Sequence, residues 1–95
     1  MQINSILIVG GGSAGWFTAS SLCKHCPEIQ VTLIESPNVP TIGVGESTLG
    51  FINNFFRTLD MKDDEWMSAC NATYKASIKF TDFYKKGETF HYPFG

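Results

Sequence analysis

Residues 5–16 read SILIVGGGSAGW, and this stretch decides the fold. It begins with a near-continuous aliphatic run closed by Gly10, which is typical of a parallel strand covered on both faces. The following residues, WFTASSLCKHCP, repeat apolar side chains at three- and four-residue steps until Pro27 ends the helix. Residues 29–36, IQVTLIES, predict a second strand. Strand, glycine turn, helix and strand together predict one βαβ unit with a right-handed crossover.

The glycines between strand and helix fit the spacing G-x-G-x-x-G, with Gly10, Gly12 and Gly15 in the three places. The first permits a tight turn, the second lets the backbone approach a pyrophosphate, and the third lets helix and strand pack closely. Glu35 follows Gly15 by twenty residues, at the end of the second predicted strand, where a carboxylate can accept hydrogen bonds from a ribose. The pattern predicts an adenine dinucleotide site without choosing between NAD and FAD. The alternative is a turn that is glycine-rich only for packing, with Glu35 a solvated acid.

The middle of the chain predicts a loop and two helices. Residues 36–47, SPNVPTIGVGES, hold two prolines and two glycines without a period, and we interpret them as an ordered loop or strap. Ser47 or Thr48 is then expected to cap a helix whose apolar stripe runs over residues 51–59. Residues 63–72 predict a shorter helix with its acids in the first turn, where the helix dipole favours them.

Residues 73–84, TYKASIKFTDFY, alternate apolar and polar side chains, which predicts a half-buried strand. The even-numbered side chains are expected to face the core, which leaves Lys75 and Lys79 on the polar face. By itself this pattern makes both lysines solvated charges. A turn at Lys86-Gly87 then leads into an aromatic run.

Composition limits the classes of function. The chain has 95 residues with 43% hydrophobic content, so one small globular unit is expected. Seven basic residues against nine acidic ones provide no basic stripe, so we expect no nucleic-acid partner. No apolar stretch approaches the length of a membrane span, and the first residues do not resemble a secretory signal.

Three cysteines, Cys23, Cys26 and Cys70, cannot all pair within the chain, and we interpret them as free thiols in a reducing cytoplasm. The pair in CKHC falls at the end of the predicted helix and has no second ligand pair, so no metal site is expected. These two thiols are expected to be buried or half-buried.

Six segments, taken in order, resemble the N-terminal segment of the flavin-dependent tryptophan halogenases: ILIVGGGSAGW, VTLIES, PTIGVGEST, DEWM, CNATYKASIKF and HYPFG. The resemblance covers nearly the whole chain, and GVGES and YKASIKF are its most specific parts. It implies an α/β fold: an incomplete Rossmann-like FAD-binding domain with a βαβ unit, a strap loop, two helices and a further strand, as in flavoprotein monooxygenases. Residues 1–95 would be the N-terminal part of an FAD-binding halogenase domain, with the substrate domain absent.

The resemblance also implies an activity. Enzymes of this family take reduced FAD from a separate flavin reductase and use it with O2 and halide to form hypohalous acid, which halogenates an aromatic, tryptophan- or indole-like substrate. The family's W-x-W-x-I-P signature is not among these residues, so the 95-residue chain is expected to be inactive without a C-terminal portion. Two alternatives stay open: a segment of another FAD-dependent monooxygenase, and a non-catalytic FAD-binding remnant.

Residue roles follow from the resemblance by position. The FAD pyrophosphate would be held by Gly10, Gly12, Ser13, Ala14 and Gly15, and the adenosine ribose by Glu35. The strap would approach the flavin through Ile42, Gly43 and Val44. Lys79 falls on the catalytic lysine of the family, which reverses the interpretation of this lysine as a solvated charge. Phe94 falls on an aromatic that stacks against the indole, and Tyr92 stands where tryptophan-specific members tend to carry histidine, so the substrate-binding pair leaves the substrate open.

Overall fold

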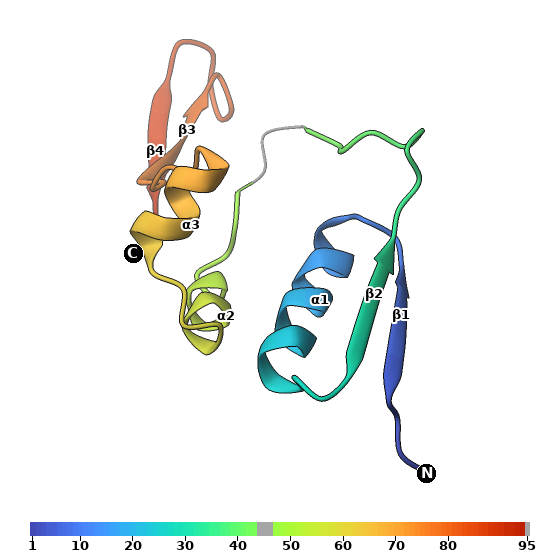
Figure 1. The fold of residues 1–95 in the computed structure, drawn as a ribbon. Coiled ribbons are helices and arrows are strands. Elements are labelled where there is room, and N and C mark those ends of the chain that lie inside the picture. The colour runs from blue at the N-terminus through green and yellow to red at the C-terminus, as the bar shows by residue number, and fades with distance from the viewer. Residues whose placement is uncertain (44–46, 95) are drawn as a thin grey trace. The chain divides into compact units, whose positions relative to one another are not determined.

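The computed structural model describes residues 1–43 and 47–94. These residues divide into two compact units, Met1–Lys62 and Asp63–Gly95 (Figure 1). Each unit has its own pair of strands, parallel in the first unit and antiparallel in the second. The predicted α/β class is confirmed.

The first unit begins with the predicted βαβ arrangement. Strand β1, Ser5–Val9, leads into helix α1, Ser13–His25, and then into strand β2, Gln30–Ile34. The strands pair in parallel over five positions, from Ser5 opposite Gln30 to Val9 opposite Ile34. Parallel neighbours need a crossover connection, and α1 is that crossover, lying along the strand pair (Figure 1). The prediction of a βαβ unit from the glycine-rich stretch is therefore confirmed.

The strand pair is covered on one face only. Residues of β1 and β2 alternate between half-buried and exposed, and Ala19 of α1 is the buried residue among those described. Leu7 and Val9 on the other face of β1 are 59% and 76% exposed. The expectation that this strand is covered on both faces is wrong for the described chain, because a parallel sheet needs helices on each face and this unit supplies α1 to one of them.

Helix α2, Ile52–Thr58, follows the strap. Its N-cap residue is Phe51, which makes no side-chain cap, so the helix begins later than the predicted N-cap at Ser47 or Thr48 would place it. The reason is a turn before the helix, in which the N–H of Ile52 donates to the carbonyl of Leu49 at 3.0 Å. The apolar side chains of the predicted stripe are half-buried, except for an exposed Phe51.

Two contacts link α1 with α2 and with the residues just after it. The rings of Phe17 and Phe55 lie 4.9 Å apart between centroids. The Lys24 ammonium donates to the Asp60 carboxylate at 2.5 Å, and this hydrogen bond, with the lysine charge, lowers the pKa of Asp60. Both groups are exposed, so the ion pair orients the helix ends and adds little stability.

The second unit begins with helix α3, Asp63–Cys70, whose first turn holds three acids as predicted. Strand β3, Ser77–Thr81, is shorter than the predicted 73–84. Before the strand, the Tyr74 hydroxyl donates to the Asp63 carboxylate of α3 at 2.9 Å, while the Ala76 carbonyl accepts a hydrogen bond from the N–H of Phe94 at 3.0 Å.

The aromatic run after the predicted turn forms a further strand, in addition to those predicted from the sequence. Strand β4, Thr89–Pro93, pairs antiparallel with β3, from Ser77 opposite Pro93 to Thr81 opposite Thr89. The predicted turn at Lys86-Gly87 is present, with Gly87 at a φ of +86° and its N–H donating to the Asp82 carboxylate at 2.5 Å. A glycine-containing turn between two runs rich in aromatic residues is a hairpin signal that could have identified β4.

The even-numbered face of β3 is only partly covered. Phe80 is half-buried and stacks on Phe90 of β4, with ring centroids 5.0 Å apart, whereas Ile78 is 44% exposed. The expectation that this face is buried in a core is therefore met at Phe80 alone.

Candidate functional site

The glycine loop joins the end of β1 to the start of α1. Gly10 has a φ of +120°, and its N–H donates to the carbonyl of Ile34 in β2 at 2.8 Å. Gly12 is the N-cap of α1 and makes no side-chain cap. The N–H of Trp16 donates to the Gly12 carbonyl at 3.1 Å. The N–H groups of the first helical residues, Ser13, Ala14 and Gly15, therefore precede the hydrogen-bonded ladder of the helix and are directed out of its end.

The physical reason for glycine differs among the three motif positions. Gly10 adopts a φ that L side chains rarely adopt. At Gly15 an added Cβ would lie 2.0 Å from the backbone oxygen of Gly10, so only glycine lets strand and helix approach this closely. Gly12 differs from both, because its φ of −78° and ψ of −179° suit any residue and an added Cβ would have no atom within 4 Å.

The open space at Gly12 shows whether a nucleotide phosphate can approach the loop. Neither backbone conformation nor packing requires glycine there, whereas a ligand phosphate approaching the backbone at the start of α1 does. A pyrophosphate therefore fits the loop as it stands: the space a side chain would fill is open, and adjacent helix N–H groups can donate to an anion.

Glu35 lies directly against this loop. A Cβ on Gly11 would fall 1.7 Å from Oε2 of Glu35 and 2.5 Å from its Cβ. The carboxylate of the second strand end is thus beside the glycine loop, as the spacing in sequence predicted. A ribose hydroxyl beside the loop would have an acceptor in this carboxylate.

The strap residues predicted to contact the flavin make fewer contacts with the rest of the chain than Glu35 does. It begins with a turn in which the N–H of Asn38 donates to Ser36 Oγ at 3.2 Å. Ile42 is 78% exposed, and a Cβ on Gly43 would meet no atom within 4 Å. The predicted Val44 lies outside the described residues. The structure therefore brings together the glycine loop and Glu35, and leaves Ile42 and Gly43 in exposed, irregular chain.

In the second unit, the β3–β4 hairpin determines what lies beside Lys79. Residues directly opposite in an antiparallel pair project to the same face. Lys79 is opposite His91, and Ser77 Oγ lies 2.9 Å from Nδ1 of His91. Tyr92 is opposite Ile78, on the other face. The hairpin therefore brings His91 and Ser77 to the face of Lys79 and does not bring Tyr92 there.

Tyr92 and Phe94 form an aromatic corner at the end of β4. Their ring centroids lie 6.2 Å apart in an edge-to-face arrangement, and the N–H of Phe94 donates to the Ala76 carbonyl at 3.0 Å. The Lys75 ammonium lies 4.2 Å from the centroid of the Phe94 ring. Lys75, expected to be a solvated charge, thus makes a cation–π contact with an aromatic predicted to stack on substrate.

The cysteines and the other possible metal ligands in the described part of the chain do not form a further site. Cys23 and Cys70 are exposed and Cys26 is half-buried, and all three are free thiols, so the expectation of burial is wrong for Cys23. Its stretch of α1 has only a two-stranded sheet beneath it. In the described part of the chain, no group of three His, Cys, Asp or Glu side chains could hold a metal ion.

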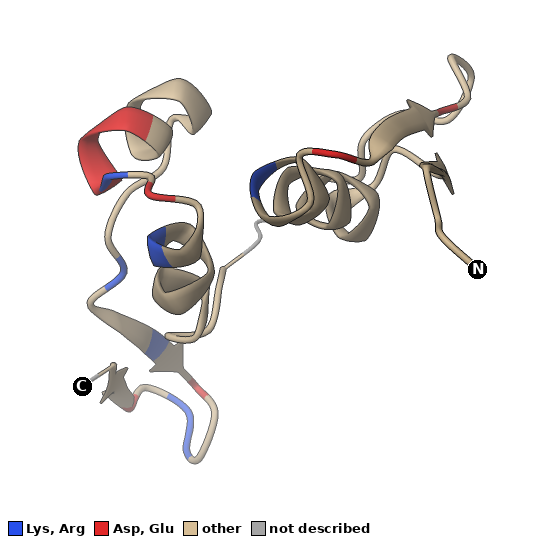
Figure 2. Cartoon of the chain, turned by 60° about the horizontal axis from the view of Figure 1, so that its bottom comes forward, with Lys and Arg blue, Asp and Glu red and all other residues tan. Residues whose placement is uncertain are grey.

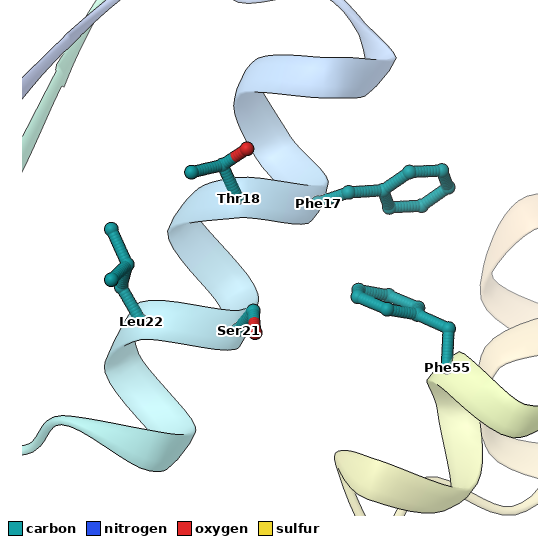
Figure 3. A pocket seen from close by; sticks show the side chains of 5 residues that line it. All are labelled: Phe17, Thr18, Ser21, Leu22 and Phe55. Carbon is teal, nitrogen blue, oxygen red and sulfur yellow. The ribbon is translucent and has the colours of Figure 1, made fainter.

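An open hollow lies along the middle of α1 and is lined by Phe17, Thr18, Ser21, Leu22 and Phe55 (Figure 3). Its two phenylalanine rings project toward one another from α1 and α2. No charged side chain lines it, so it is a packing feature of the first unit.

Charged residues are dispersed in small groups of both signs (Figure 2), with the acids of the first turn of α3 as one such group. None of the described helices is both long and apolar enough to cross a bilayer.

The parallel βαβ unit, the glycine loop and the adjacent acid define a Rossmann-like α/β protein of the dinucleotide-binding class. A family model for tryptophan halogenase matches residues 5–95. The chain belongs to the tryptophan halogenase family.

Individual relatives agree with this assignment. The tryptophan 6-halogenase SttH of Streptomyces toxytricini is 50% identical over 92 residues, which are 96% of this chain and 18% of that protein. The tryptophan 7-halogenase RebH of Lentzea aerocolonigenes is 47% identical over 89 residues, 92% of this chain and 17% of that protein. The chain thus spans less than a fifth of the length of either relative.

Solved structures show the same fold. The crystal structure of SttH matches with a TM-score of 0.83 at 49% identity, over 97% of this chain and 19% of that chain. Xcc4156, a flavin-dependent halogenase from Xanthomonas campestris, matches with a TM-score of 0.85 at 34% identity, over 100% of this chain and 20% of that chain.

Proposed function

We propose that residues 1–95 are the N-terminal part of an FAD-binding halogenase domain. The observation that carries the proposal is the open space at Gly12, beside the N–H groups that begin α1 and next to the Glu35 carboxylate. Among dinucleotides, family membership favours FAD over NAD.

In this proposal the backbone of the glycine loop holds the FAD pyrophosphate. Gly10 and Gly15 shape the loop, Gly12 leaves space for the phosphate, and the N–H groups of Ser13 and Ala14 donate to it. Glu35 accepts hydrogen bonds from the adenosine ribose, and Ile42, Gly43 and Val44 of the strap contact the flavin. When bound and reduced, FAD would supply electrons to O2, so that O2 can oxidise halide to hypohalous acid.

Lys79 is the proposed catalytic residue. An ammonium on β3 donates hydrogen bonds to hypohalous acid and so holds and polarises it beside an electron-rich ring. Tyr92 and Phe94 are the proposed substrate-binding residues, because two edge-to-face rings offer an apolar surface to a flat aromatic molecule.

The whole enzyme is proposed to need further components. Turnover belongs to a polypeptide in which this segment is joined to the rest of a halogenase, including the substrate domain. A separate flavin reductase supplies reduced FAD, and the substrates are halide and an aromatic small molecule. We also propose a cytoplasmic location, in keeping with three free thiols.

Replacing the matched segment of SttH with residues 1–95 gives a polypeptide in which Lys79 can be tested. With tryptophan, chloride, FAD and a flavin reductase, it should form chlorotryptophan, detected by the chlorine isotope pattern in mass spectrometry. Lys79→Ala should bind FAD as before and form no chlorotryptophan, because the group that holds the oxidant is gone. Lys86→Ala, which removes a lysine from the β3–β4 turn, is the matched control and should retain product formation.

Chlorotryptophan from the Lys79→Ala protein would contradict the role of Lys79. A second candidate function, another FAD-dependent monooxygenase, would be favoured if the joined protein formed hydroxylated and no chlorinated product.

A further inference from the structure

The polar face of the β3–β4 hairpin holds a second hydrogen-bonding group that the site above does not use. His91 lies directly opposite Lys79 in the strand pair. Side chains in such a pair begin about 4.5–5.5 Å apart at Cβ and extend to the same side of the sheet. Both side chains are exposed, so this face is open to a small molecule.

Ser77 fixes the orientation of the His91 ring. Ser77 is diagonal to His91 on the same face, and its Oγ lies 2.9 Å from Nδ1. When the serine hydroxyl donates to Nδ1, the neutral ring carries its proton on Nε2. The ring then presents an N–H donor on the face where the Lys79 ammonium also donates.

We propose that His91, oriented by Ser77, is a second donor beside Lys79, and that these two groups together bind the oxygen atom of hypohalous acid. This inference rests on the proposed function. Two donors on one face match an oxygen that accepts hydrogen bonds, and bonds from a charged donor are stronger than neutral ones. No bond is made or broken in the binding step, so His91 positions the oxidant and Ser77 positions His91.

The same geometry separates the roles of neighbouring aromatic residues. Tyr92 projects to the face of Ile78, so it does not lie on the face that carries Lys79 and His91. Tyr92 and Phe94 then bind the substrate ring from the end of the hairpin, while His91 retains the oxidant near Lys79.

The ring tautomer is measured in the full chain without FAD. Nitrogen NMR of the 15N-labelled protein at about pH 8.5, where an ordinary imidazole is neutral, resolves the two histidines, with His25 as an internal reference. His91 should carry its proton on Nε2. Ser77→Ala should redistribute the proton between the two nitrogens, and Ser77→Thr should restore the wild-type spectrum. Unchanged β3–β4 amide shifts verify that each variant is folded.

An Nδ1–H tautomer in the wild type, or ring shifts that Ser77→Ala leaves unchanged, would overturn the proposal.

The second arm uses the joined polypeptide described above and a soluble dye that traps free hypohalous acid. His91→Ala should lower the halogenation rate at least about tenfold, as expected for loss of one oriented donor. It should leave the rate of flavin oxidation unchanged, so that more oxidant reaches the dye. Thr89→Ala, on the same face of β4, is the control and should change neither quantity.

The outcomes separate the two proposals. If the wild-type joined protein forms no halogenated product, the proposed function is overturned together with this inference. If it halogenates, Lys79→Ala abolishes product and His91→Ala changes nothing, this inference alone is overturned.

Discussion

At the scale of single residues, Asp63 shows how one carboxylate organises the approach to the candidate site. It accepts hydrogen bonds from the Tyr74 hydroxyl at 2.9 Å and from Nε1 of Trp66 at 3.3 Å. The bond from Tyr74 raises the pKa of that phenol, because ionisation would remove the donated proton and place two negative charges together. The contact ties α3 to the residues that lead into β3 and Lys79.

Asp63→Asn should lower the pKa of Tyr74 toward its ordinary value, since the neighbouring charge is lost. Because the pKa of Tyr74 is raised in the folded chain, its hydrogen bond to Asp63 stabilises the fold fully below the ordinary tyrosine pKa of about 10. This stabilisation is lost as the pH rises through the raised pKa of Tyr74. Carbon NMR of the Tyr74 ring during an alkaline titration measures the change. Asp64→Asn removes a more distant charge and keeps the hydrogen bond, so its effect should be smaller. Equal effects of the two variants would contradict the assignment to Asp63.

Residue roles differ in how far the sequence predicts them. The spacing of the glycines and Glu35 was sufficient to predict the loop and the acid beside it, because a βαβ unit has a nearly fixed geometry. Lys79 was singled out by resemblance, since an alternating strand pattern does not distinguish it from Lys75. His91 was not predicted beside Lys79, because that neighbour depends on the register between two strands, and the second strand had not been assigned.

At the scale of elements, β1 and α1 depend on their closest approach, at Gly15. A methyl group there would lie 2.0 Å from the Gly10 carbonyl oxygen, and this oxygen belongs to the backbone and cannot rotate away. The start of α1 can therefore pack this closely against the end of β1 only because Gly15 has no Cβ.

Gly15→Ala should separate α1 from β1 and destabilise the chain by about 1–3 kcal/mol, as overpacking usually does. Chemical denaturation followed by circular dichroism measures the loss. An unchanged denaturation midpoint would contradict the close packing at this position.

Elements also show where local patterns fail. The helix after the strap begins at Ile52, because a turn at Leu49 precedes it, and a polar residue upstream is not sufficient to mark a helix start. Strand β3 is shorter than its alternating pattern at both ends: Tyr74 is hydrogen-bonded to α3, and Asp82 has a φ of +55°, outside the strand region. In both places a specific contact overrides the local preference.

At the scale of the whole molecule, large apolar side chains are exposed in both units, among them Leu7, Val9, Phe51 and Tyr74. Two-stranded sheets are marginally stable in water without further packing. A ligand that binds only the folded chain should therefore raise the melting temperature measurably, by mass action.

The proposed function depends on the glycine loop as an FAD pyrophosphate site, and Gly12 tests that role most directly. Gly12→Ala places a methyl group where no protein atom lies within 4 Å and where the backbone conformation suits alanine, so the fold should be unaffected. The same methyl group occupies the space proposed for the phosphate.

The decisive measurement is a titration of the chain with FAD, followed by flavin fluorescence and by the melting temperature. The wild type should bind FAD and melt at a higher temperature with it, whereas Gly12→Ala should melt like the wild type without FAD and bind at least about tenfold more weakly, a difference of about 1.4 kcal/mol. Equal FAD affinity of the two proteins, or no FAD binding by the wild type, would contradict the account.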